Sequence, residues 1–242
     1  MTTELTVASF NIHWGVGAWP EFRPFDVVEA CASLGADVLV LQEAWHADGA
    51  ASQQQQVADA TGMRVIVEQS LARSTRDGRP EVVARADSTE GSGSWGIALL
   101  SRFDVTGTQT HPLPDFPLDD VDRAMLRADL AIGDRHLTVC GTHFTHLKYG
   151  SPLHGPGLRR TLPPASEPAL LLGDMNMWGF VLDVLKPRGW RRALKGKTWP
   201  AQRPWHQIDH LLVTDGVEVL VAEAMPDLGS DHRAIRARIR LR

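Results

Sequence analysis

The chain has 242 residues, and 43% of them are apolar, which is enough to bury a large core without a disulfide or a structural metal. Its formal net charge is −4, so overall charge does not attract it to nucleic acid or to an anionic membrane. The N-terminus lacks the regions of a signal peptide and no apolar run reaches 18 residues, so we expect a cytoplasmic protein without membrane insertion.

The first third of the chain predicts a strand, a helix and a second strand. The apolar run 5–10 reads as a strand that ends at Asn11. A helix is expected over 24–34, because its apolar residues recur on one face. The strand 37–42 is apolar on both faces, as in a buried strand, and is expected to place Glu43 at its end.

The middle of the chain predicts a helix at 53–61 and then mostly strands. The polar segment 70–94, in which Arg residues alternate with Asp, Ser and Gly, is expected to be a long surface loop. The expected strands on either side of it cover 63–68, 95–101, 105–113, 123–132 and 136–141.

The last third predicts a loop at 148–168, which is rich in Pro and Gly, and a short helix at 180–185. The final strands are expected at 169–172, 207–213, 217–223 and 234–241. In the last of these, apolar residues alternate with Arg236, Arg238 and Arg240, which indicates a solvated strand face rather than a nucleic-acid patch.

These elements favour a single domain over residues 1–242, built from two packed sheets with helices outside them. Cys31 and Cys140 match no metal-binding or redox spacing, so both are expected to be buried structural thiols.

Polar residues with metal-binding or proton-carrying side chains follow several of the expected strands. Each alone has an ordinary explanation, such as a turn or a helix cap. Together they indicate one site, and Asp209, inside an apolar strand, adds a carboxylate that would be costly to bury unpaired. The strand-end residues are Asn11, Glu43, His143, Asp174, Asn176, Asp231 and His232.

The chemistry of phosphoester hydrolysis accounts for this set. Asn11, Glu43 and Asp231 offer hard oxygens for Mg²⁺ or Mn²⁺. Asp174 and Asn176 are expected to position or deprotonate the attacking water. His232, oriented by Asp209, and His143 are expected to act as proton carriers or cations at the phosphoryl group.

Other residues near these positions have two interpretations. The tryptophans could stack on a base or sugar, or pack in the core. Arg123 and Arg127 could contact phosphate or be solvated. His146 is a weaker candidate than the main set, and His154 is expected to be a loop residue. The tryptophans concerned are Trp14, Trp45, Trp178 and Trp205.

Six short motifs resemble, in order, those of the endonuclease/exonuclease/phosphatase superfamily over residues 9–232. The resemblance implies a deoxyribonuclease I-like four-layer α/β sandwich of two mostly antiparallel sheets flanked by helices. It also implies a metal near Glu43 and Asn11, His232 paired with Asp209, and Asp174 and Asn176 at the phosphate. The motifs are Ser9-Phe10-Asn11-Ile12, Leu41-Gln42-Glu43, Gly141-Thr142-His143, Leu172-Gly173-Asp174-Met175-Asn176, Ile208-Asp209-His210 and Ser230-Asp231-His232.

The branch of the superfamily is less defined, because fold and core motifs do not fix the substrate. His143 after Thr142 is similar to the nuclease, sphingomyelinase, deadenylase and 5-phosphatase branches, and less similar to apurinic endonucleases. The Arg that follows the Gly-Asp-x-Asn motif in 5-phosphatases is replaced by Met177-Trp178-Gly179.

We therefore predict a monomeric, divalent-metal-dependent phosphoester hydrolase that uses direct water attack. A nuclease-type phosphodiesterase, acting on nucleic acid, is the first choice. A phosphatase or phosphodiesterase of a small or lipid-linked phosphoester is the alternative. A non-catalytic binding module on the same fold is disfavoured, because no expected site position is replaced.

Overall fold

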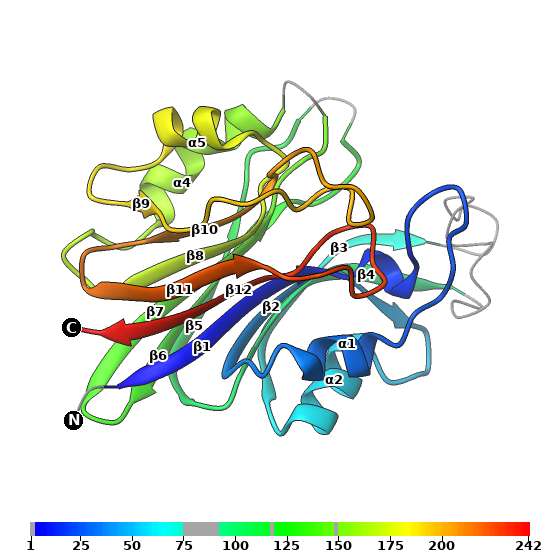
Figure 1. Cartoon of the computed structure of the whole chain (residues 1–242), viewed down its shortest axis with the longest axis horizontal. Coiled ribbons are helices and arrows are strands. Elements are labelled where there is room, and N and C mark those ends of the chain that lie inside the picture. The colour runs from blue at the N-terminus through cyan, green and yellow to red at the C-terminus, as the bar shows by residue number, and fades with distance from the viewer. Residues whose placement is uncertain (1–2, 75–91, 117–118, 148–149) are drawn as a thin grey trace.

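The computed structural model describes residues 3–74, 92–116, 119–147 and 150–242. Two six-stranded sheets pack face to face (Figure 1). Helices α1 (Val27–Ser33) and α2 (Gln53–Thr61) lie on one outer side, and α4 (Gly155–Thr161) and α5 (Gly179–Leu185) lie on the other. This is the four-layer α/β sandwich predicted from the sequence. Within these described ranges, the helices are too short or too polar to cross a bilayer.

The first sheet has the strand order β11-β12-β1-β2-β4-β3. Its central pair β1 and β2 is parallel and is connected through α1 (Val27–Ser33), and its other neighbours are antiparallel. The strands are β1 (Glu4–Asn11), β2 (Val38–Ala47), β3 (Arg64–Ser74), β4 (Gly93–Ser101), β11 (Val217–Ala224) and β12 (Ile235–Leu241).

The second sheet has the order β5-β6-β7-β8-β10-β9 and is built in the same way. Its parallel pair is β7 and β8, between which lie the short 3₁₀ helix η3 (Ser151–His154) and α4 (Gly155–Thr161). The strands are β5 (Asp104–Pro112), β6 (Ala124–Ile132), β7 (Arg135–His143), β8 (Ala169–Asp174), β9 (Arg191–Arg192) and β10 (Asp209–Val213).

Three apolar layers hold the sandwich together. The largest lies between the sheets and includes Val40, Leu126 and Val139. A second layer lies under α1 and α2 (Gln53–Thr61), and a third lies under α4 and α5 (Gly179–Leu185). The central strands are therefore covered on both faces, which explains their nearly unbroken apolar sequence.

Most predicted elements are found within a few residues of their expected positions, and local chemistry explains their ends. Asp26 caps α1 by accepting the backbone N–H of Glu29 at 2.8 Å, and Ser52 caps α2 in the same way. The alternation of β12 is confirmed, because Arg236 and Arg240 lie outside and approach Glu223 and Glu218. Both cysteines are buried, and burial raises the pKa of each thiol to about 12.

Two predicted loops are shorter than expected. Strand β3 continues to Ser74 and strand β4 begins at Gly93, so both ends of the expected loop 70–94 are paired strands. Residues 75–91 of that loop lie outside the described residues. The expected loop 148–168 contains η3 and α4. Pro is tolerated in the first turn of a helix, and Leu158 anchors α4 by packing on the second sheet.

Candidate active site

A cleft of about 850 Å³ opens where the C-terminal ends of the central strands of both sheets meet. Asn11 and Asp209 are buried behind this surface and contact residues that line it. The eight predicted site residues, which lie in strands of both sheets and in the segments after β8 and before β12, thus form one cluster. Those that line the cleft are Glu43, His143, Asp174, Asn176, Asp231 and His232.

Asn11 links the two sheets at the base of the cleft. It ends β1, and its Nδ2 donates to Glu43 Oε1 at 3.0 Å and to Asp174 Oδ2 at 3.2 Å. Its Oδ1 accepts the backbone N–H of His13 at 3.1 Å. The amide therefore fixes two carboxylates, one from each sheet, at a defined separation.

The sequence predicts Glu43 at the end of its strand, but the structure places it inside strand β2. Strand β2 continues to Ala47, and the register against β4 shifts between Gln42 and Ala44. Glu43 is the extra residue of this β-bulge and has a φ of +54°. Such bulges re-aim a side chain, and here Glu43 lines the cleft.

His143 ends β7 between the carboxylates of the two sheets. Its Nε2 lies 3.6 Å from Asp174 Oδ2 and 3.7 Å from Glu43 Oε1. Burial, assisted by the positive charge of Arg123, lowers the pKa of His143 well below its ordinary value. The imidazole is therefore neutral at pH 7, and carries one N–H.

Asp174 and Asp209 from the second sheet, with His232 from the segment before β12 of the first, form the buried centre of the cluster. Asp209 lies opposite Asp174 in the β8–β10 ladder, and His232 Nδ1 is 3.0 Å from Asp209 Oδ2. The other ring nitrogen of His232 is 3.7 Å from Asp174 Oδ2. One imidazole thus lies between two carboxylates.

Burial and the charges of neighbouring residues shift the pKa values of both Asp174 and His232. Burial raises the pKa of Asp174 to about 7, against the effect of His232 and with a contribution from the Asp209 carboxylate. Burial alone would lower the pKa of His232, but Asp209, Asp231 and Asp174 outweigh it and raise that pKa well above its ordinary value. His232 is therefore a cation at neutral pH.

Asn176 is held beside Asp174 by its own backbone. Its N–H donates to Asp174 Oδ1 at 2.9 Å, and its Nδ2 donates to the carbonyl of Phe144 at 3.0 Å. A φ of +47° makes this turn, in a conformation that Asn tolerates better than most residues.

Asp231 lines the same cleft as Glu43, although the two residues come from opposite ends of the chain. Its Oδ2 accepts the indole N–H of Trp199 at 3.3 Å, and its Oδ1 lies 3.5 Å from His13 Nδ1. The geometric condition for a shared site, that Glu43 and Asp231 face one cavity, is met.

The donor atoms in the described part of the chain offer two positions for a cation. Glu43 Oε2 is buried and has no hydrogen-bond partner, so a divalent ion would satisfy a carboxylate oxygen that is otherwise unpaired. Asp174, Asp209 and His232 also bring one ligand atom each within 4.8 Å of one another. His232 and Asp209 already pair with each other at 3.0 Å, whereas Glu43 Oε2 has no partner, which favours the Glu43 position.

The two arginine candidates have different surroundings. Arg123 is 5% exposed, lines the cleft and is held by Asp119 at 3.0 Å. Arg127 lies on β6, pairs with Asp129 at 3.0 Å and does not line the cleft. Arg123 can therefore present positive charge to a bound anion, and Arg127 cannot.

The aromatic candidates also divide. Trp14 and Trp178 line the cleft, Trp45 is buried in the first sheet, and Trp205 is exposed outside the cleft lining. Among the histidines, His146 lines the cleft. His154 is buried against Phe144, with 4.9 Å between ring centroids.

Several cleft residues were not anticipated from the sequence. His13 follows Asn11 by two positions and could have been found by searching beside the motif. Trp95 begins a predicted strand and the others lie outside the six motifs, so only the folded chain brings them to the cleft. These additional lining residues are Trp95, Phe180, Trp199 and His206.

The sequence from residue 8 to residue 232 matches the Endonuclease/Exonuclease/phosphatase family. No curated protein matches the sequence closely enough to count as a relative. Among solved structures, an endonuclease/exonuclease/phosphatase from Beutenbergia cavernae is similar with a TM-score of 0.75 and 18% identity, covering 98% of this chain and 72% of that one.

Two further structures with more specific descriptions have the same fold. The human nocturnin catalytic domain with a bound sulfate anion has a TM-score of 0.70 and 16% identity, covering 99% of this chain and 94% of that one. A mannosyl-6-phosphatase from Bacteroides thetaiotaomicron has a TM-score of 0.65 and 18% identity, covering 97% and 99%. At these identities the likeness establishes the fold.

Proposed function

Because this chain belongs to the endonuclease/exonuclease/phosphatase family, we propose that it is a divalent-metal-dependent phosphoester hydrolase that uses direct attack of water at phosphorus. The observation that carries the proposal is the convergence of the Glu43, Asp174 and Asp209 carboxylates and two histidines at one cleft. A binding module would not need this costly burial of ionisable groups.

The proposed metal ligands are Glu43, Asn11 and Asp231. Glu43 has the free buried oxygen, whereas the oxygens of Asn11 and Asp231 already accept hydrogen bonds. The bound ion, Mg²⁺ or Mn²⁺, would neutralise charge on the phosphoryl oxygens.

The protein groups around the phosphoryl site have complementary proton states. Asp174, with a pKa of about 7, is suited to accept a proton from the attacking water near neutral pH. His232, a cation held by Asp209, can stabilise the phosphoryl oxygens or protonate the leaving oxygen. His143 is neutral and can donate one hydrogen bond, and Asn176 orients the water or the phosphoryl group.

Two classes of substrate are proposed, in order of preference. A nuclease-type phosphodiesterase remains the first choice from the motifs, with a small or lipid-linked phosphoester as the alternative. The solved neighbours include both a protein with bound sulfate and a sugar phosphatase, so the fold accommodates several oxyanions. The cytoplasmic location and the monomeric state stay predictions.

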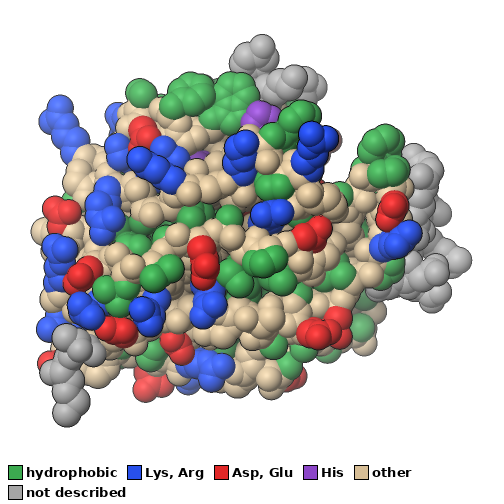
Figure 2. Space-filling view, in the orientation of Figure 1, with side chains coloured by type: hydrophobic (Ala, Val, Ile, Leu, Met, Phe, Trp, Pro, Cys, Tyr) green, Lys and Arg blue, Asp and Glu red, His purple; other side chains and the backbone are tan. Residues whose placement is uncertain are grey.

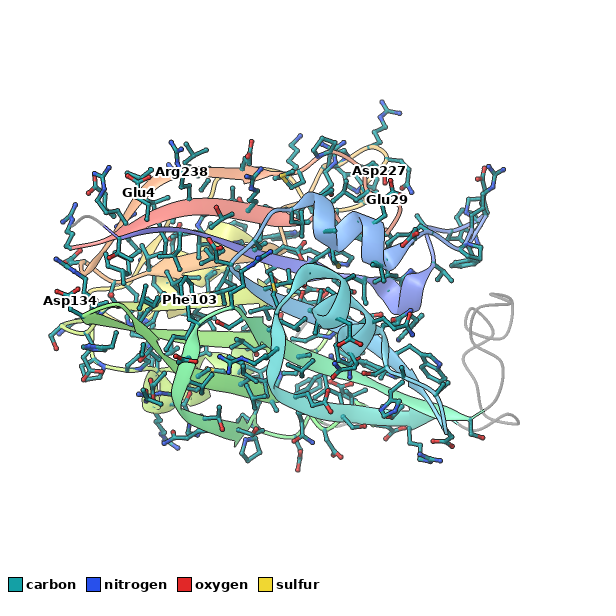
Figure 3. The ribbon with its side chains drawn as sticks, turned by 90° about the horizontal axis from the view of Figure 1, so that it is seen from below. Glu4, Glu29, Phe103, Asp134, Asp227 and Arg238 are labelled. Atoms are coloured by element: carbon teal, nitrogen blue, oxygen red, sulfur yellow. The ribbon has the colours of Figure 1, made fainter. Side chains whose placement is uncertain are left out.

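Hydrolysis of bis-p-nitrophenyl phosphate, with and without EDTA, tests the proposal. We expect turnover with Mg²⁺ or Mn²⁺ that EDTA abolishes, and its loss in Glu43→Ala and His232→Ala. Asp134→Asn is the matched control, because this exposed residue precedes β7 and lies, with Glu4, at the end of the sandwich where β1 begins (Figure 3). No turnover on a broad phosphoester panel would instead support a binding module.

A further inference from the structure

Exposed apolar side chains gather beside the mouth of the cleft. Of the seven large apolar side chains that are exposed in the described ranges, five lie on η3, on α5 and in the segments flanking α5 and β10. Two of them, Trp178 and Phe180, also line the cleft. The five are Leu153 (56% exposed), Trp178 (51%), Phe180 (65%), Val184 (75%) and Trp205 (66%).

These side chains form one patch, which we call the α5 surface. The rings of Trp178 and Phe180 are 5.6 Å apart, and His206 connects Trp178 to Trp205 through centroid distances of 5.8 and 5.7 Å. Leu153 joins them because η3 packs beside α5. Patches of this kind on a soluble domain indicate an interaction site.

Helix α5 itself has the wrong sequence for a solvated surface helix. Its residues are Gly-Phe-Val-Leu-Asp-Val-Leu, so Asp183 is its one polar side chain. Leu182 faces the core, while Phe180 and Val184 face outward. A helix that is apolar on nearly all sides is normally covered on both faces.

Lys and Arg outnumber Asp and Glu in the part of the chain that carries the α5 surface. Residues 151–206 contain nine of the 25 Lys and Arg residues but three of the 29 Asp and Glu residues. At α5, Arg159 donates to the carbonyls of Val184 and Leu185, and both Lys186 and Arg192 approach Asp183. Figure 2 shows Lys and Arg beside hydrophobic side chains along the edge where α4 and α5 lie in Figure 1.

We propose that the α5 surface docks on an anionic lipid bilayer. Aliphatic side chains such as Leu153 and Val184 gain by leaving water for the acyl-chain boundary, and Trp is favoured at that depth. The surrounding cations match the negative headgroups. A single-stranded nucleic acid would use aromatic rings and cations, but it would leave the exposed Leu and Val without a role.

Docking in this way places the cleft mouth at the level of the headgroup phosphates, because Trp178 and Phe180 belong to both surfaces. This step rests on the proposed hydrolase function. It places the lipid-linked alternative above the nucleic-acid substrate that the motifs favour, and assigns a lipid-headgroup phosphoester as the substrate. Water attacks phosphorus, the bond from phosphorus to the leaving alcohol breaks, and the released oxygen takes a proton.

Vesicle flotation tests the docking surface without reference to catalysis. We expect binding to phosphatidylcholine vesicles that contain about 30% phosphatidylserine, weaker binding to pure phosphatidylcholine, and loss in high salt. Leu153→Ser and Val184→Ser should each lower the vesicle partition coefficient about fivefold. Arg188 is exposed and lies three residues after α5, and Arg188→Glu should lower the coefficient by a similar factor. Val221→Ser, an exposed apolar residue on β11, is the matched control and should bind like the unaltered protein.

The alternatives give different results. Absent vesicle binding, or binding unaffected by Leu153→Ser and Val184→Ser, overturns the proposal. So does binding of a labelled single-stranded oligonucleotide that depends on these residues without any vesicle binding. Loss of vesicle binding in Val184→Ser, in a protein that does not hydrolyse bis-p-nitrophenyl phosphate, supports the docking surface and refutes only the proposed function.

The substrate assignment has its own readout. Val184→Ser should reduce the release of phosphocholine from sphingomyelin in phosphatidylserine vesicles about fivefold and leave bis-p-nitrophenyl phosphate hydrolysis unchanged, because Val184 does not line the cleft. An active enzyme that releases no headgroup from vesicle lipids would overturn the assignment.

Discussion

The two sheets share an architecture but contribute different chemistry to the cleft. Each has a central parallel pair, and these pairs deliver Asn11 and Glu43 from the first sheet and His143 and Asp174 from the second. In the first, Glu43 keeps a buried oxygen without a partner, whereas Asp174 of the second faces two imidazoles, His143 of its own sheet and His232 from the segment before β12 of the first. The comparison indicates that one side is suited to hold a cation and the other to move protons.

The largest expected effect comes from breaking the proton-transfer side. Asp209→Asn removes the charge that holds His232 as a cation, and we expect kcat to fall about 10³-fold while the fold is retained. Steady-state kinetics on bis-p-nitrophenyl phosphate, with circular dichroism as the folding check, measures this. A loss below tenfold would show that the Asp209–His232 pair is not needed for the reaction.

The next effect separates the proposed metal-binding side of the cleft from the proton-transfer side. Glu43→Gln keeps the side-chain shape but removes the charge, so we expect the Mn²⁺ dissociation constant, measured by electron paramagnetic resonance, to rise at least about tenfold. Asp174→Asn should change Mn²⁺ affinity less than it changes kcat. The reverse pattern, with Asp174→Asn weakening Mn²⁺ binding and Glu43→Gln not, would move the metal to the Asp174, Asp209 and His232 group.

A third effect concerns stability on the second sheet's side. Burial and the Arg123 charge lower the pKa of His154 to about 4, so the unfolded chain binds this proton first as the pH falls below about 6.5. The stabilising contribution of the neutral, buried His154 to the free energy of unfolding is therefore complete above about pH 6.5. About 2 kcal/mol of this contribution should be lost by pH 5, because the unfolded chain is protonated there and the folded chain is not.

Urea unfolding at pH 7.5 and pH 5 measures this loss. His154→Gln removes the titrating group, so its stability should change less between the two pH values than that of the unaltered protein. Part of the dependence should remain, because burial also lowers the pKa of His210 to about 4. An unchanged pH dependence in His154→Gln would contradict the assignment.

The smallest effect tests how Asp231 is held. Trp199→Phe keeps a ring at the cleft but removes the N–H that Asp231 accepts, so kcat/KM should fall about three- to tenfold. Trp205→Phe is the matched control for the soluble substrate bis-p-nitrophenyl phosphate, because this ring belongs to the α5 surface but lies outside the cleft lining, and kcat/KM for that substrate should stay unchanged. Equal effects of the two substitutions would argue against a role for the Trp199 hydrogen bond.

Apolar periodicity was sufficient to predict two packed sheets with outer helices, because the buried central strands have little freedom in their sequence, and the family resemblance supplied the four-layer arrangement. It failed at α4, where Gly155, Pro156 and Gly157 favour a loop and the helix depends on Leu158 packing against the second sheet. It also failed at β3 and β4, whose polar ends pair beyond the core. Tertiary contacts override local preference in both places.

For the candidate site, the motifs predicted which residues converge, but not how they are aimed. Arg123 and Arg127 looked equivalent in sequence, yet Arg123 is buried at the cleft and Arg127 is paired on the strand surface. The contact of Trp199 with Asp231 joins segments 32 residues apart that no short motif connects. Such orientations depend on the folded backbone, and a pattern of residue types does not contain them.

The extra residue in β2 constrains the length of this strand as well as its composition. Leu41 and Ala44 both face α1 and α2 although they are three positions apart, because Glu43 interrupts the regular alternation. Deleting Glu43 would leave Leu41 and Ala44 two positions apart, which a regular pleat also places on one face, so the strand would keep its packing but lose the carboxylate that lines the cleft. We therefore expect this one-residue deletion to remove the site while the sandwich still folds.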